Sequence, residues 1–81
     1  MEDNRIKNII SALDDLNEDS TVPKNIRARV KNIIGILKEE TDVQIRINRA
    51  LQELDEISED TNMQSYTRTQ IWNIASMLES I

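Results

Sequence analysis

The sequence has 81 residues, of which 15 are acidic and 10 are basic, and it contains no cysteine and no histidine. A chain of this length forms one domain, here residues 1–81, and its net charge of −5 argues against nucleic acid or an anionic membrane as a partner. The missing residue types exclude disulfides, a thiolate nucleophile, the commonest general base and the commonest transition-metal ligand. The amino-terminal stretch is charged, and no segment approaches the ~20 apolar residues of a membrane span, so we expect a cytoplasmic protein.

Apolar residues recur at helical spacing and strand-type alternation is absent, which predicts an all-α chain. We expect a first helix from about Asp3 to Glu18. A second helix is predicted from near Thr21, whose hydroxyl can cap the first turn, with Pro23 at an early position that needs no N–H. The stripes predicted to be buried on these two helices are Ile6, Ile9, Ile10, Leu13 and Leu16, then Ile26, Val30, Ile33 and Leu37.

The second half of the chain predicts two more helices. Either Thr41 or Asp42 is expected to cap the third helix, and Asn62 is expected to cap the fourth, because their short side-chain oxygens can accept the unpaired amides of a first turn. The predicted stripes are Ile47, Ala50, Leu51, Leu54 and Ile57, then Ile71, Ile74, Leu78 and Ile81. Three larger side chains are expected in the core or at its edge: Met63, Tyr66 and Met77.

An internal repeat organises these helices. Residues 1–40 align without a gap on residues 42–81 when Leu13 is placed on Leu54, and the identical pairs include Arg27 with Arg68. Such a repeat is one supersecondary unit used twice. The links between the predicted helices are short, and short links place neighbouring helices antiparallel. We therefore predict an antiparallel four-helix bundle built from two repeated αα-hairpins.

Each half carries an acidic cluster where its first helix ends: Asp14, Asp15, Glu18 and Asp19, then Asp55, Glu56, Glu59 and Asp60. Carboxylate oxygens suit divalent cations, but the spacing lacks the alternating ligands and the glycine of a calcium loop. A structural interpretation starts from the hairpins, where residues equally distant from a turn lie at one level. It predicts two ion pairs, Asp14–Arg27 and Asp55–Arg68. Asp19 and Asp60 are expected to cap the helices that follow them.

Four residues are candidates for an interaction surface: Trp72, Ile45, Gly35 and Ser76. Trp72 lies off the stripe of the fourth helix, near the small Ser76, and Ile45 points away from the stripe of the third. Trp72 is either an aromatic contact anchor or an indole folded over the edge of the core. Gly35 matches Ser76 in the repeat; close approach of another helix would explain it, and an exposed, tolerated glycine is the alternative.

The segments TVPKNIR, LDEISEDTNM and TRTQIWNIASMLESI resemble a small archaeal family of uncharacterised all-α proteins. The resemblance covers nearly the whole chain, and the carboxy-terminal segment with Trp72 is its most specific part. Members of that family usually carry proline where this chain has Gln64, which matters little at a first-turn position. The resemblance implies an up-and-down, loosely bromodomain-like four-helix bundle, with no assigned activity, cofactor or site. The segment from Asp42 to Leu54 also resembles, more weakly, the inner helix of HEAT-type repeats.

No catalytic constellation accompanies these features, because the hydroxyl nucleophiles have no histidine and no GxSxG elbow to activate them. We therefore predict a non-catalytic helical interaction or structural module with no cofactor and an unidentified protein partner. The first candidate partner is a second copy, bound through the outward faces of the second and fourth helices. Two alternatives stay open. One is a divalent-cation-binding or metal-dependent protein that uses the acidic clusters, and the other is an adaptor whose hairpins part to admit an amphipathic helix.

Overall fold

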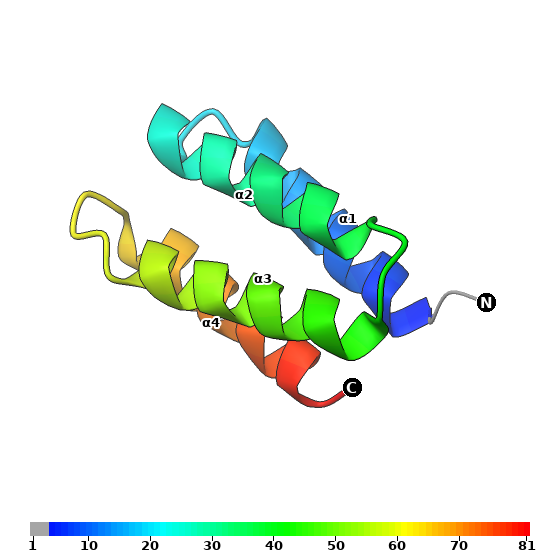
Figure 1. Cartoon of the computed structure of the whole chain (residues 1–81). Coiled ribbons are helices and arrows are strands. Elements are labelled where there is room, and N and C mark those ends of the chain that lie inside the picture. Colours follow the sequence, from blue (N-terminus) through cyan, green and yellow to red (C-terminus); the bar gives the residue numbers. More distant parts are fainter. Residues whose placement is uncertain (1–3) are drawn as a thin grey trace.

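The computed structural model describes residues 4–81. Its helices are α1 (Asn4–Glu18), α2 (Lys24–Leu37), α3 (Val43–Ser58) and α4 (Ser65–Glu79), and no strand occurs among the described residues (Figure 1). Asp3, where the first predicted helix begins, lies outside that range. The four predicted helices are therefore present in the predicted order, and the all-α class is confirmed.

The helices form a closed, antiparallel ring. Both α1 and α3 pack against α2 and α4, whereas α1 and α3, like α2 and α4, lie at opposite corners without close approach of their main chains. Successive helices run in opposite directions, and the start of α1 lies at the same end of the bundle as the close of α4 (Figure 1). This is the predicted up-and-down four-helix bundle, in which short links leave consecutive helices side by side.

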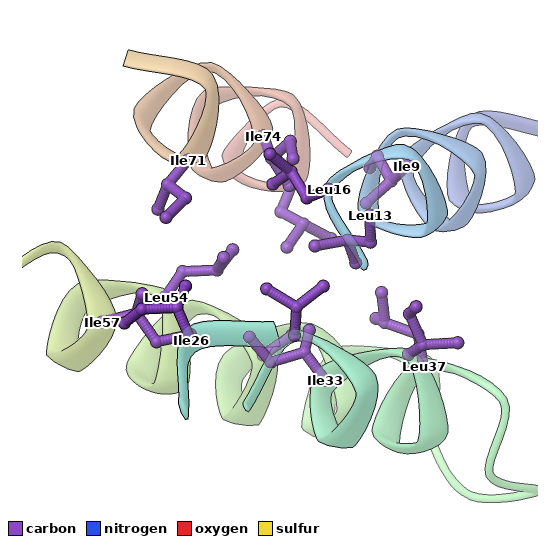
Figure 2. Close-up of a cluster of buried hydrophobic side chains, with 14 of the residues drawn as sticks. Ile9, Leu13, Leu16, Ile26, Ile33, Leu37, Leu54, Ile57, Ile71 and Ile74 are labelled. Atoms are coloured by element: carbon purple, nitrogen blue, oxygen red, sulfur yellow. The ribbon is translucent and has the colours of Figure 1, made fainter. Parts of the chain in front are cut away.

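The apolar stripes of all four helices meet along the axis of the bundle. Figure 2 shows Leu13, Ile33 and Leu54 among the side chains that point inward, and each of these three has no solvent-accessible surface. Most of the predicted stripe residues are buried, while Ile10, Leu51 and Ile81 are half-buried at the edge. Burial of these side chains, each worth about 1.5–3 kcal/mol, is what holds the bundle closed.

Five side chains outside the predicted stripes are also buried: Val22, Ile34, Ile36, Met63 and Thr67. Val22 and Met63, equivalent in the repeat, close the two hairpin ends of the core with 1% and 8% of their surfaces exposed. Thr67 is the one buried polar residue among those described, with 1% exposed, and its equivalent in the first half is Ile26. Tyr66, by contrast, is 67% exposed. Its predicted place in the core was wrong, because the neighbouring Thr67 takes the inward position.

The link between α1 and α2 is longer than predicted. Helix α2 begins at Lys24 rather than near Thr21, and its first turn has no side-chain cap. Asp19 Oδ1 accepts both the N–H of Thr21 at 2.9 Å and its hydroxyl at 2.7 Å. These two bonds form a local turn at Asp19–Thr21, and the helix does not follow directly, since α2 begins three residues after Thr21. The predicted capping roles of Asp19 and Thr21 are therefore replaced by a turn that leaves Val22 free to enter the core.

The equivalent link between α3 and α4 is built the same way. Asp60 Oδ1 accepts the N–H of Asn62 at 2.8 Å, and α4 begins only at Ser65. Neither Asp60 nor Asn62 caps α4, contrary to the prediction. The cap predicted for the third helix is correct at Asp42, because its carboxylate accepts first-turn N–H groups of α3.

Two arginines complete the ring where the halves meet. Arg46, near the start of α3, donates from Nη1 to the carbonyl oxygen of Leu37 at 2.7 Å, at the end of α2. Its repeat equivalent Arg5, on α1, donates from Nη1 to the carbonyl oxygen of Ser80 at 3.5 Å, just after α4. The last carbonyls of a helix have no partner within the helix and carry partial negative charge. The two guanidinium groups therefore stabilise equivalent helix ends and join α2 to α3 and α4 to α1.

Candidate interaction surface

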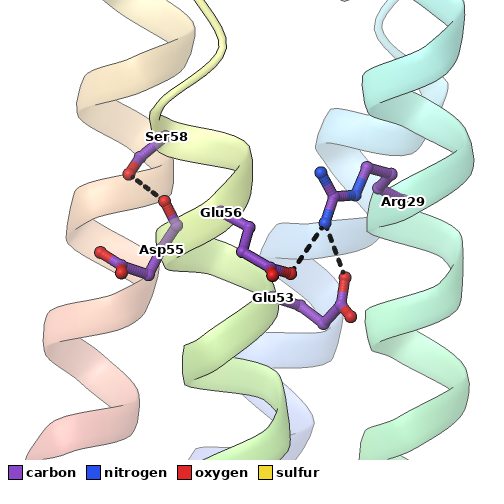
Figure 3. Close-up of polar contacts among 5 residues, drawn as sticks. All are labelled: Arg29, Glu53, Asp55, Glu56 and Ser58. Carbon is purple, nitrogen blue, oxygen red and sulfur yellow. Dashed lines mark hydrogen bonds and ion pairs between the residues drawn. The ribbon is translucent and has the colours of Figure 1, made fainter.

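The predicted Asp55–Arg68 ion pair is not formed. Arg68 donates instead to two main-chain carbonyls, from Nη2 to Asp60 in the α3–α4 link at 2.7 Å and from Nε to Ser58 at the end of α3 at 3.2 Å. The Asp55 side chain is exposed and lies on the side of α3 away from Arg29 (Figure 3). The guanidinium of Arg68 thus supplies hydrogen bonds to carbonyls that have no partner within the helix, and Asp55 is left to solvent.

The equivalent Asp14–Arg27 pair is not formed within the described residues either. Asp14 is exposed, and Arg27 lies half-buried with its Nε shielded from solvent and without a hydrogen-bond partner. The pKa of Asp19 is lowered by hydrogen bonds from the hydroxyl and then the N–H of Thr21; burial opposes this shift, and the positive charge of Arg27 adds to it. The positive charge of Arg27 therefore acts on the α1–α2 turn.

Ion pairs instead join α3 to α2, through Arg29, and to the link that follows α2, through Glu39. Arg29 Nη2 lies 3.1 Å from a carboxylate oxygen of Glu53 and 3.1 Å from one of Glu56 (Figure 3), and Arg49 lies 2.8 Å from Glu39. These pairs are partly exposed, so each contributes about 0–1 kcal/mol. Sequence reasoning missed them because it applied the equal-distance rule only within hairpins. About the link between α2 and α3, the same rule places Arg29 level with Leu51, two residues before Glu53.

The acidic clusters do not gather into a cation site. Within residues 4–81, no group of three or more Asp or Glu side chains is arranged to hold a metal ion. Asp19 and Asp60 are turned into their own links, and Glu56 is paired with Arg29. No described residue arrangement therefore favours the divalent-cation alternative.

Helix α4 presents an unusual outward surface. Five large hydrophobic side chains are exposed among the described residues, and three are on this helix: Tyr66, Trp72 and Met77, exposed by 67%, 55% and 39%. Only two of the 15 residues of α4 are charged, Arg68 and Glu79. Trp72 is therefore outside the core, and Met77 is more exposed than predicted. We call the following set of exposed residues the α4 face: Tyr66, Thr69, Trp72, Asn73, Ser76 and Met77.

Helical geometry divides the α4 face into a ridge and two flanks. At 100° per residue, Thr69 and Ser76 lie opposite the buried stripe and form a ridge of small side chains. Trp72 stands on the flank toward α3, whereas Tyr66 and Met77 stand on the flank toward α1. A low ridge between large apolar side chains lets another helix approach closely, as helices that pack side by side do.

A groove of about 500 Å³ lies beside Trp72, between α3 and α4. Its apolar lining residues are Leu51, Leu54, Ile71, Trp72 and Ala75. The repeat equivalent of Ala75 is Ile34, which is 93% buried in the first hairpin, with 7% exposed. A single methyl group cannot fill the space that an isoleucine side chain fills, which accounts for the opening. We call this opening the Trp72 groove.

Gly35 and Ile45 lie elsewhere. Gly35 is exposed on α2, and a Cβ added to it would meet no atom within 4 Å, so no helix approaches closely there. The tolerated-glycine alternative is thus the correct one. Gly35 lines a second groove of about 500 Å³, between α2 and α3. Ile45 is 51% exposed near the start of α3 and lines neither groove. Of the four predicted surface residues, the structure brings only Trp72 and Ser76 together.

Among the described residues, none of the helices combines the length and the apolar character that crossing a bilayer requires.

The whole chain, residues 1–81, matches the model of an uncharacterised protein family, UPF0147. The chain belongs to this family. Two crystal structures are similar to the UPF0147 chain described here. One is of the protein of unknown function MMP1188, from Methanococcus, with 51% identity, a TM-score of 0.91 and coverage of 96% of this chain and 90% of that one. The other is of a UPF0147 protein from Thermoplasma acidophilum, with 33% identity, a TM-score of 0.90 and coverage of 95% and 92%.

These matches confirm the archaeal family that the sequence resembled and the fold that the resemblance implied. The family is described as uncharacterised and MMP1188 as a protein of unknown function, so neither assigns an activity. No curated protein matches the UPF0147 chain significantly. Function has to be argued from the surface of the molecule.

Proposed function

We propose that this UPF0147 protein is a non-catalytic helical interaction module and that the α4 face is its contact surface. The observation that carries the proposal is Trp72, which is 55% exposed on a helix whose inward stripe is complete without it. Tryptophan is the residue most enriched among the anchors that dominate protein interfaces. Burial of its large apolar surface by a partner lowers the free energy of the complex. Its N–H can still form a hydrogen bond at the rim of the interface.

The charge distribution supports the same surface. Helices α1 and α3 each carry five charged residues, whereas α4 carries two, and the Arg68 charge is directed at the main chain of the preceding link. Depletion of charge together with aromatic residues and methionine is the composition that distinguishes the centre of an interface from ordinary surface. Single exposed apolar side chains are common, but three of the five found among the described residues lie on this one 15-residue helix.

The position of α4 in the bundle limits which surfaces the dimer predicted from the sequence could use. That prediction used the outward faces of α2 and α4 together, but these helices occupy opposite corners of the bundle. Their outward faces point in opposite directions and cannot form one contact surface. Self-association through α4 alone remains one form of the proposed function.

The adaptor alternative finds less support. For the hairpins to part, the bundle would have to expose its core and break the contacts of Arg46 and Arg5 with opposite helix ends, along with those of Arg29 with α3. The Trp72 groove already offers an apolar surface on the outside of the closed bundle. Contact with the outside requires no opening of the fold.

Affinity capture from native extract tests the proposal when wild type is compared with two variants. Trp72→Glu places a charge on the α4 face. Ile45→Glu is the matched control, because it makes the same kind of change at a side chain of similar exposure on α3. We expect wild type and Ile45→Glu to retain the same bound proteins and Trp72→Glu to lose them, with unchanged helical circular dichroism. Equal capture by all three proteins would show that the α4 face is not the contact surface.

A further inference from the structure

We propose that the partner of the α4 face is a second copy of the chain, bound as a twofold-symmetric dimer in which two α4 helices pack antiparallel and each Trp72 enters the Trp72 groove of the other copy. This inference rests on the proposed function and names the partner. It follows from the charge of the face, the relation of Trp72 to the groove, and the size of the molecule.

Charge selects α4 among the surfaces that could pair with themselves. Each copy has a net charge of −5, so two copies repel, and the repulsion is smallest where the surfaces that meet carry little charge. In a twofold interface every residue near the axis meets its own equivalent, so a charge near the axis meets a like charge. The ridge of α4 places Thr69 and Ser76 there, and neither carries a charge. A partner of different sequence would instead be expected to face a surface of opposite charge.

The equivalent surface of α2 illustrates the contrast. The position that corresponds to Trp72 is Lys31, which is exposed, and the position that corresponds to Ala75 is Ile34, which is buried. Two α2 helices paired in the same way would bring lysines together and would have no large aromatic side chain to bury. Of these two equivalent surfaces only that of α4 suits self-pairing, and a twofold contact made through it ends at two copies instead of continuing into a filament.

The protrusion and the space that can receive it lie on the same side of the molecule. Trp72 lines one wall of the Trp72 groove, whose opposite wall is formed by Leu51 and Gln52 on α3. A twofold rotation about the small-residue ridge carries Trp72 of one copy toward the groove of the other, and the reverse contact is then made as well. Asp55 and Glu79 also line the groove, and they stay hydrated if they remain at the rim of the interface.

The dimensions of the molecule suit an interface of moderate size. The bundle measures 36 × 20 × 16 Å, and α4 has 15 residues. One long side therefore offers about 600–700 Å² before surface relief is counted, close to the ~800 Å² per partner of a standard interface. The contact needs most of that side, including the Trp72 groove, and we expect a reversible dimer.

Sedimentation velocity over a wide concentration range, combined with Trp72 fluorescence, tests the inference. Trp72 is the only tryptophan of the chain, so its emission reports directly on this site. We expect sedimentation to move from dimer to monomer on dilution while the emission shifts to longer wavelength. Trp72→Glu should weaken the dimer by about a thousandfold, since a hot-spot residue is worth at least about thirtyfold and the symmetry counts each substitution twice. Ile45→Glu should leave the dissociation constant within about threefold of wild type, because sites away from an interface contribute little.

The outcomes separate this inference from the proposed function. A dimer that Trp72→Glu dissociates and Ile45→Glu preserves supports the inference. A wild-type protein that stays monomeric at the highest concentration overturns it, as does a dimer that survives Trp72→Glu. If such a protein still captures a partner from extract through Trp72, the proposed function stands and only the identity of the partner is wrong. If capture is also independent of Trp72, both proposals are overturned.

Discussion

The hydrogen bonds of Arg68 yield a prediction for which the equivalent residue in the first half of the repeat serves as the experimental control. In Arg68→Met the alkyl part of the side chain is kept and the two donated hydrogen bonds, to the carbonyls of Ser58 and Asp60, are removed. Hydrogen bonds from a charged donor are worth about 1.5–3 kcal/mol each. Arg68 is only half-buried and water can reach part of the link, so we take the low end and expect a loss of about 2–3 kcal/mol.

Arg27→Met is the matched control, because Arg27 is the repeat equivalent of Arg68 but leaves its Nε without a hydrogen-bond partner. We expect this variant to lose less than about 1 kcal/mol, the typical effect of a partly exposed charge. Urea denaturation followed by circular dichroism measures both variants, and the difference corresponds to a melting temperature about 10 °C lower for Arg68→Met. Equal losses in the two variants, or a smaller loss in Arg68→Met, would refute the reasoning that helix-end carbonyls determine where this guanidinium lies.

Three further predictions concern the core, the glycine and the turn. Leu54→Ala should lower the free energy of unfolding, measured by urea denaturation, by about 2–5 kcal/mol. Leu54 has no exposed surface, and the bundle is too small to refill the cavity left by the truncated side chain. Gly35→Ala should raise the free energy of unfolding by up to about 1 kcal/mol, because the added methyl group meets no atom within 4 Å and alanine favours the helix. A lower free energy of unfolding in this variant would reveal a contact at Gly35. The pKa of Asp19 is lowered in the folded state, so its contribution to stability is present above its ordinary pKa and is lost as pH falls through the lowered one. Thr21→Val should raise that pKa toward its ordinary value in a carboxylate NMR titration, and an unchanged titration would exclude the hydroxyl as its main cause.

The fold could be predicted from the sequence because one physical signal dominates it. The apolar stripes have helical spacing in every helix, and stripes of this kind have to meet in a shared interior. The helix starts were harder to predict. Thr21 is an acceptable cap by residue type, yet Asp19 bonds it first, and the competition between a turn and a cap depends on whether Val22 must reach the core.

The side-chain partners could not be predicted from level along a hairpin alone. Asp55 and Arg68 are equally distant from their turn, but the long side chain of an arginine can reach several acceptors. Arg68 donates to the main-chain carbonyls of Ser58 and Asp60 instead. Across the link between α2 and α3, Arg29 pairs with Glu53, which is two residues beyond its own level. Whether two residues at one level face each other depends on the rotation of each helix about its own axis. Only the packed structure fixes that rotation.

The candidate surface was partly visible in the sequence. The angular position of Trp72 predicts that it points outward, and its exposure agrees. The Trp72 groove depends on the difference in volume between Ala75 and Ile34, which aligning the repeats exposes but which has meaning only when both helices are in place. The isolation of Gly35 and Ile45 from this surface likewise required the arrangement of the bundle.

The internal repeat gives the strongest argument that α4 is specialised. Where the two halves share a residue, as at Arg5 and Arg46, the shared side chain stabilises equivalent helix ends. Two differences between the halves, Lys31 against Trp72 and Ile34 against Ala75, lie at the Trp72 groove and its equivalent in the first hairpin. Folding alone would be served by filling the groove and by keeping a charge on the surface, since an exposed indole and an underfilled groove both forgo stability in a small domain. A surface that departs from its own copy in both respects at once is best explained by contact with a partner.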